Sequence, residues 1–236
     1  VKRPRIKETY LIQGAYNADT KIGTAHLRYI LDIGNDRCDK YRVIIDGKCG
    51  DSEFHTEHKP WFVANRVGFE IENCKLWNVR GNGAPNLYDV TVTLLRDGVP
   101  CDRKDFRFGF RELALINSET TDDNGIGEFR FYINGKPIYI MGTNHVPADM
   151  FHSKDKERIP KILKLAADCG CNMIRCWGGN VYEDDLFYDM CDELGIAVWQ
   201  DFGMACGTYP QDERMQRMIA DEAAAVIKRL RQHPCI

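Results

Sequence analysis

Hydrophobic and polar residues alternate with a period of two through most of residues 1–112. In the segment 25–33 every second residue is apolar, from Ala25 to Ile33, which predicts a strand with one buried face. The segment 89–95 is rich in valine, threonine and leucine, and such β-branched and apolar segments favour strands. No long run of helical periodicity interrupts this half of the chain. The pattern therefore predicts an antiparallel β-sandwich of immunoglobulin type over residues 1–112.

Asp-Gly and Asn-Gly pairs mark the expected hairpin turns, because these residues adopt positive φ at little cost. The pairs are Asp46-Gly47, Asp97-Gly98 and Asn134-Gly135. The last pair lies between two apolar segments, which predicts a hairpin whose second arm continues to Thr143.

Short apolar segments alternate with helical periodicity in the second half of the chain. The sequence predicts a helix over 155–168, a strand over 172–177, a helix from Asn180, a strand over 196–202 and a helix over 212–231. Asn180 is expected to cap its helix, with Glu183 three residues on completing a capping box. Together with the second arm of the hairpin, this order is β-α-β-α-β-α, which is typical of a parallel sheet with crossover helices.

Three such units do not close a TIM barrel, which needs eight. We therefore predict two domains: the sandwich over 1–112, and over 113–236 the first part of a (β/α)8 TIM barrel, truncated before strand four. The charge distribution favours two domains, since 1–112 carries 19 basic and 16 acidic residues and 113–236 carries 13 and 19. The alternative is a small self-contained α/β domain, which is less favoured because three strands are few for a covered sheet.

Composition excludes several classes of function. A net charge of -3 argues against a nucleic-acid partner, and the absence of a run of about 20 apolar residues argues against a membrane span. The amino terminus leads into no apolar segment, so we expect no signal peptide. The ten cysteines form no C-x-x-C pair, which predicts reduced thiols and a cytoplasmic protein. His55 and His58 are expected to be a solvated pair rather than a zinc site.

Polar and aromatic residues follow each strand of the predicted parallel sheet, where active sites of TIM barrels lie. They are Asn144, His145, Arg175, Trp177 and Asp201. This mixture suits a sugar, because hydroxyl groups bond to amides and carboxylates and the C–H face of the ring packs on an aromatic side chain. We therefore predict a carbohydrate-binding site with no metal and no cofactor.

Each of these residues also has a structural interpretation. Arg175 is as readily a structural partner of Asp201 as a ligand contact, and His145 is as readily structural as catalytic. Trp177 could fill the space between the domains, although the two glycines after it favour an open pocket. Trp199 is expected in the core. Retaining hydrolysis needs two carboxylates about 5–5.5 Å apart, and no second acid at a strand end pairs with Asp201.

A series of sequence motifs runs through both halves of the chain. In the second half they are Phe131 to Pro137, Gly142 to Asn144, Asn172 to Gly179, Cys191 to Gly195, Val198 to Phe202 and His233-Pro234. In and just after the first half they are Leu76-Trp77, Pro85 to Tyr88 and Phe108 to Arg111. Together these motifs resemble glycoside hydrolase family 2, and in particular its β-mannosidase-like branch.

The resemblance implies a fragment of a retaining exo-β-glycosidase that acts on terminal β-linked sugars, most readily β-mannosides, and requires no metal. Both catalytic glutamates would lie beyond this chain, so the isolated chain is expected to be inactive. Arg175 would support the nucleophile, and Asn144, Trp177 and Asp201 would shape the sugar pocket. We also expect self-association through an open sheet edge. The alternatives are a non-catalytic carbohydrate-binding or assembly module, and an unrelated α/β enzyme using Asp201 and His145.

Overall fold

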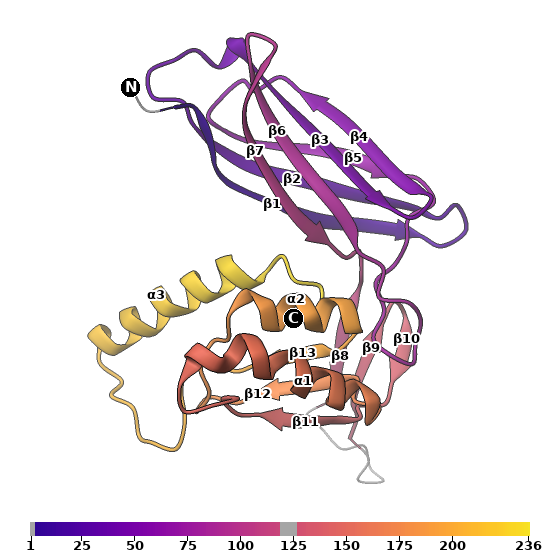
Figure 1. Cartoon of the computed structure of the whole chain (residues 1–236), viewed down its shortest axis with the longest axis vertical. Coiled ribbons are helices and arrows are strands. Elements are labelled where there is room, and N and C mark those ends of the chain that lie inside the picture. Colours follow the sequence, from indigo (N-terminus) through magenta and orange to yellow (C-terminus); the bar gives the residue numbers. More distant parts are fainter. Residues whose placement is uncertain (1–2, 119–126) are drawn as a thin grey trace. The chain divides into compact units, whose positions relative to one another are not determined.

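The computed structural model describes residues 3–118 and 127–236, and its regular structure is mainly β (Figure 1). Contacts divide the chain into two compact units. The first contains Val1–Lys75 and Asn86–Phe110, and the second contains Leu76–Pro85 and Arg111–Ile236. The short segment Leu76–Pro85 thus belongs with the second unit, although strands of the first unit flank it on both sides.

The first unit consists of two antiparallel sheets. Its strands are β1 (Arg5–Asn17), β2 (Ile22–Asp32), β3 (Tyr41–Cys49), β4 (Ser52–His58), β5 (Ala64–Ile71), β6 (Tyr88–Arg96) and β7 (Val99–Phe108). One sheet has the order β1-β2-β5 and the other has the order β4-β3-β6-β7. The expected strands at 25–33 and 89–95 are confirmed as β2 and β6.

Alternate residues of these strands build the core of the first unit. Leu27 and Tyr29 of β2 and Val43 and Ile45 of β3 are buried, as the period of two predicts. Phe54 of β4 stacks on Phe69 of β5, with ring centroids 4.8 Å apart, so side chains from the two sheets meet. Burial of this kind stabilises by about 25 cal/mol for each Å² of apolar surface removed from water.

Two of the three predicted turns are confirmed and one is wrong. Asp97-Gly98 and Asn134-Gly135 have positive φ at both residues and close hairpins. Asp46-Gly47 instead lies inside β3, which turns only after Cys49. A Cβ on Gly47 would lie 2.1 Å from the ring of Phe54, so the glycine makes room for a core aromatic side chain.

The second unit holds a short antiparallel sheet, a parallel sheet and three described α-helices (Figure 1). The antiparallel strands are β8 (Leu113–Asn117), β9 (Phe129–Ile133) and β10 (Lys136–Ile138), and the parallel strands are β11 (Gly142–His145), β12 (Met173–Cys176) and β13 (Ala197–Gln200). The helices are α1 (Asp155–Asp168), α2 (Asp185–Leu194) and α3 (Glu213–Leu230), and short 3-10 turns cover Cys38–Lys40 and His152–Lys154. The described parallel sheet thus has three strands, in the order β11-β12-β13.

The predicted helices over 155–168 and 212–231 are confirmed, and Asp212 caps α3 by accepting a hydrogen bond from the backbone N–H of Met215. The helix expected from Asn180 begins only at Asp185. The capping box is wrong because Glu183 is buried and bonded to His145.

The hairpin arm expected to reach Thr143 is interrupted between β10 and β11. Buried Asn172 explains the break, because its side chain satisfies backbone groups that leave the ladder. Its amide donates to the carbonyl of Tyr139, and its side-chain oxygen accepts from the N–H of Met141, both at 2.9 Å. The chain thereby changes from an antiparallel hairpin to the parallel sheet.

One buried carboxylate fastens the last residues of the chain to α2. Asp192, 2% exposed, accepts hydrogen bonds from His233 Nδ1 at 2.7 Å and from the backbone N–H of Cys235 at 2.9 Å. The carbonyl of Cys235 in turn accepts from the N–H of Val198 in β13 at 2.6 Å. Residues near the carboxyl terminus therefore lie beside the edge of the parallel sheet.

The remaining sequence expectations have mixed outcomes. All ten cysteines are free thiols. His58 is not a solvated histidine, because its Nδ1 lies 2.6 Å from the hydroxyl of Tyr29 and burial lowers its pKa. Trp199 is not in a closed core, since it is 41% exposed. Within residues 3–118 and 127–236, no helix has the length and apolar character needed to cross a membrane.

Candidate functional site

Three of the residues on the parallel sheet lie side by side in register. Asn144 of β11 pairs with Arg175 of β12, and Arg175 pairs with Trp199 of β13. All three are exposed, whereas the next residues His145 and Cys176 are buried. Because successive residues of a strand point to opposite faces, Asn144, Arg175 and Trp199 share one face of the sheet.

Arg175 and Asp201 form the central polar contact of the site. The Arg175 Nη2 donates to Asp201 Oδ2 at 2.5 Å, and its Nε donates to Oδ1 at 3.4 Å. Asp201 Oδ2 also accepts from the backbone N–H of Gly178 at 3.1 Å. The predicted pairing of Arg175 with Asp201 is therefore present, and it fixes a guanidinium and a carboxylate at the carboxyl ends of β12 and β13.

Two glycines after Trp177 allow the loop to pack closely. A Cβ on Gly178 would lie 2.1 Å from the carbonyl oxygen of Met204, so the next loop touches Gly178 directly. A Cβ on Gly179 would lie 2.2 Å from the Trp177 ring, which therefore packs over the glycine that follows it. The Trp177 side chain is partly buried and keeps part of its indole surface accessible at this edge.

His145 lies on the helix side of the sheet, away from the row of Asn144 and Arg175. Its Nε2 is 2.9 Å from Glu183 Oε1, and the two side chains are 4% and 2% exposed. The ring also packs on Phe187 of α2, with centroids 4.8 Å apart. The structure thus gives His145 a buried partner, and a hydrogen-bonded pair of this kind fixes the end of β11 to the segment before α2.

We call Asn144, Arg175, Trp177 and Asp201, at the carboxyl end of the parallel sheet, the polar row. Aromatic side chains cover the exposed face of the sheet beside this row. Trp199 stacks on Phe129 of β9 at 6.4 Å between centroids and meets the edge of Phe131 at 5.9 Å. An open cavity of about 630 Å³ lies here, lined mainly by apolar residues that include Tyr139, Met173 and Trp199. Its lining suits apolar groups, whereas the carboxyl end of the sheet, with Arg175 and Asp201, suits polar groups.

Among the described residues, one group of three side chains has the spacing of metal ligands: Asp189, Asp192 and His233, whose ligand atoms lie within 4.8 Å of one another. Both oxygens of Asp192 already accept hydrogen bonds from His233 and Cys235. These hydrogen bonds hold residues 233–235 against α2, so the Asp192 carboxylate has a structural role and the group is not assigned as a metal site.

Arg175, Trp177 and Asp201 come from neighbouring loops and strand ends at one edge of the sheet, and Asn144 joins them through the register of β11 and β12. His145 is separated from them by the sheet. The sequence did not identify Gly178 as the partner of Asp201 or Glu183 as the partner of His145. The signal that would have placed Trp199 on the Arg175 face is its position two residues before Asp201, because side chains two residues apart along a strand share a face.

Comparison with known proteins supports the motif analysis. The family model for glycosyl hydrolases family 2 matches residues 6–111. A β-mannosidase from Capra hircus is 38% identical over 161 residues, which are 68% of this chain and 18% of that protein. A β-mannosidase B from Thermothelomyces thermophilus is 40% identical over 171 residues, which are 72% of this chain and 20% of that protein.

Solved structures agree with the sequence comparison. The crystal structure of a β-D-mannosidase from Dictyoglomus thermophilum matches with a TM-score of 0.87 and 33% identity, covering 99% of this chain and 29% of that one. A β-glucuronidase from Bifidobacterium dentium matches with a TM-score of 0.81 at 21% identity, covering 99% of this chain and 37% of that one, and shows the shared fold alone. The chain thus spans about a fifth of the curated relatives described above. Over the part that it spans, the chain carries the sequence of a family 2 glycoside hydrolase of the β-mannosidase-like kind.

Proposed function

We propose that the protein carrying this chain is a retaining exo-β-glycosidase that hydrolyses terminal β-mannosides. The observation that carries the proposal is the polar row at the carboxyl end of the parallel sheet. There Arg175 and Asp201 are bonded to each other, and Asn144 and Trp177 lie on the adjoining strand and loop. The relatives named β-mannosidase supply the substrate class.

In this proposal the site binds the sugar at the non-reducing end. The amide of Asn144 and the carboxylate of Asp201 can bond to sugar hydroxyls. The indole ring of Trp177 can pack against the C–H face of the sugar ring. Arg175 is held by Asp201 in a fixed orientation, which leaves the remaining donors of its guanidinium for a carboxylate of the reaction centre. The chain itself supplies positioning, while the acid/base and the nucleophile come from residues outside it.

We further propose that the second unit is the start of a TIM barrel and that the first unit is an immunoglobulin-like sandwich. Two features of the second unit support the barrel. The face shared by Arg175 and Trp199 carries exposed aromatic residues, as the inner face of a barrel does before the other strands enclose it. The bond from Val198 to Cys235 starts a fourth chain segment beside β13.

The 236-residue chain alone is proposed to be inactive, since retaining hydrolysis needs two carboxylates and only Asp201 stands in the polar row. Its partner is a carbohydrate, and self-association through a free strand edge of the isolated chain remains part of the proposal. The proposed cytoplasmic location rests on the ten free thiols.

The test uses the complete protein and an aryl β-mannoside. Replacing Arg175 by Lys removes the bidentate contact to Asp201 but keeps the charge, and we expect kcat/KM to fall at least tenfold. Arg103→Lys is the matched control, because Arg103 forms an exposed ion pair with Asp105 in the first unit, and it should leave kcat/KM unchanged. Equal activity of the two variants, or turnover by the isolated chain, would overturn the proposal.

A further inference from the structure

We propose that Tyr182 is a positioning residue for the sugar site, which it serves by fastening the loop after β13 against Gly178 and Asp201. The inference rests on the proposed function. It assigns a role to a residue that neither binds the sugar nor enters the reaction.

The hydroxyl of Tyr182 connects three separate parts of the second unit. It accepts a hydrogen bond from the backbone N–H of Gly203 at 2.7 Å and donates one to Glu222 Oε1 of α3 at 2.6 Å. Tyr182 itself lies between β12 and α2. Burial and the bond to Glu222 raise the pKa of this hydroxyl, so it stays protonated and remains a donor at neutral pH.

The bond to Gly203 controls the part of the loop that touches the site. A Cβ on Gly178 would lie 2.1 Å from the Met204 carbonyl oxygen and 3.0 Å from the Phe202 carbonyl oxygen. The N–H of the same Gly178 donates to Asp201 Oδ2. Residues 202–204 therefore lie between the Tyr182 anchor and the backbone that orients the Asp201 carboxylate.

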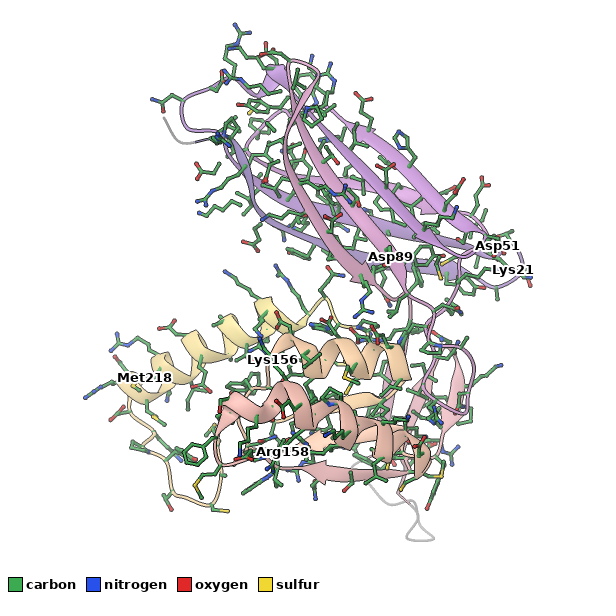
Figure 2. The ribbon with its side chains drawn as sticks, in the orientation of Figure 1. Lys21, Asp51, Asp89, Lys156, Arg158 and Met218 are labelled. Atoms are coloured by element: carbon green, nitrogen blue, oxygen red, sulfur yellow. The ribbon has the colours of Figure 1, made fainter. Side chains whose placement is uncertain are left out.

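The loop after β13 has little apolar packing of its own, since Phe202 and Met204 are 40% and 41% exposed. Of the residues in α3 only Leu230, at the far end from Gly203, is buried. Met218, one helical turn before Glu222, is 55% exposed (Figure 2). Since apolar burial contributes little there, the bonds of Tyr182 to Gly203 and Glu222 fasten residues 202–204 to the segment before α2 and to α3. The hydrogen bonds between Ala205 and Tyr209, by contrast, stay within the loop. Loss of the hydroxyl should thus displace the loop and weaken substrate binding, while the overall stability of the protein changes little.

The experiment compares Tyr182→Phe, Glu222→Gln and Glu222→Ala in the complete protein with an aryl β-mannoside as substrate. Tyr182→Phe should raise KM about fivefold or more, the loss expected for one hydrogen bond, with kcat within about twofold. Glu222→Gln keeps the acceptor oxygen and should retain the parental KM, whereas Glu222→Ala should raise it. The double variant Tyr182→Phe/Glu222→Ala should be no worse than Tyr182→Phe.

A second readout needs no turnover. Hydrogen exchange of the Gly203 amide should be faster in Tyr182→Phe, because that amide loses its acceptor, while Tm changes by no more than about 2 °C. Tyr132→Phe is the control, since the Tyr132 hydroxyl accepts a long hydrogen bond of 3.5 Å from Arg130 and belongs to β9 rather than to the loop after β13. It should change neither KM nor exchange at Gly203.

The outcomes separate the two proposals. Absence of turnover by the unmodified protein overturns the proposed function and with it a positioning role in that reaction. Unchanged exchange at Gly203 shows that Tyr182 does not fasten the loop and overturns this inference alone. Faster exchange with an unchanged KM, or a lowered Tm with an unchanged KM, identifies a purely structural tyrosine and also overturns it.

Discussion

Replacing Asp192 by Ala tests how the end of the chain is fastened to the second unit. The substitution removes both acceptors that hold His233 Nδ1 and the N–H of Cys235. Asp192 is 2% exposed, so water does not readily replace it. Hydrogen bonds to a charged group contribute about 1.5–3 kcal/mol each, and breaking a buried charged contact costs about 3–5 kcal/mol. We therefore expect the free energy of unfolding of the second unit to fall by about 3–5 kcal/mol.

Urea unfolding of the 236-residue chain at neutral pH, followed by tryptophan fluorescence, measures this loss. Trp77 reports on the second unit because it is buried and donates its indole N–H to the carbonyl of Asp192. With an m-value of about 2 kcal/mol/M, the midpoint of that transition should move down by about 1.5–2.5 M.

Asp189→Ala is the matched control in the same helix. Asp189 lies one turn earlier, is 47% exposed, and its Oδ1 is 4.0 Å from the same His233 nitrogen. An exposed pair contributes at most about 1 kcal/mol, so the control should lose no more than that. A loss below about 1 kcal/mol for Asp192→Ala, or equal losses for the two variants, would refute the conclusion that Asp192 fastens the end of the chain to α2.

Further outcomes follow from single groups. Gly178→Ala should lower the unfolding free energy of the second unit by about 1–3 kcal/mol in the same titration, because the new Cβ meets the Met204 carbonyl oxygen; an unchanged midpoint would show that the loop yields freely. Burial lowers the pKa of His58 in the folded chain. As the pH falls below about 6.5, the imidazole is therefore protonated in the unfolded chain before it is protonated in the folded one, and the free energy of unfolding decreases. His58→Gln should therefore flatten the fall in Tm of the first unit between pH 7.5 and 5.5, and a steeper fall would contradict this. Exposed Cys206 should react with a maleimide in the native chain, whereas Cys235, whose pKa burial raises far above its usual value, should react only in urea; peptide mass spectrometry distinguishes them.

The sequence predicted those features that depend on local periodicity. The strands at 25–33 and 89–95 and the helix over 155–168 appear where alternation and helical spacing place them. Local pattern also suggested the partnership of Arg175 and Asp201, because both follow parallel strands whose carboxyl ends share one edge.

The features that it missed depend on contacts between distant residues. Glu183 has the spacing of a capping box, yet its carboxylate is bonded to His145, 38 residues earlier, and the helix begins after it. Gly47 follows an aspartate as in a hairpin turn, yet it stays in the strand beneath the ring of Phe54. Trp199 follows a buried segment, yet the register of the parallel sheet places it beside Arg175 on the exposed face. In each case a tertiary partner overrides a local rule.

The relative turnover of two epimeric substrates tests the central claim most directly. The complete protein is assayed with an aryl β-mannoside and with the corresponding β-glucoside, which differs only at the C2 hydroxyl. We predict that kcat/KM for the mannoside exceeds that for the glucoside at least tenfold, and that Asp201→Asn in the polar row lowers the mannoside value. Turnover of neither substrate, or equal kcat/KM for the two epimers, would contradict a β-mannosidase function.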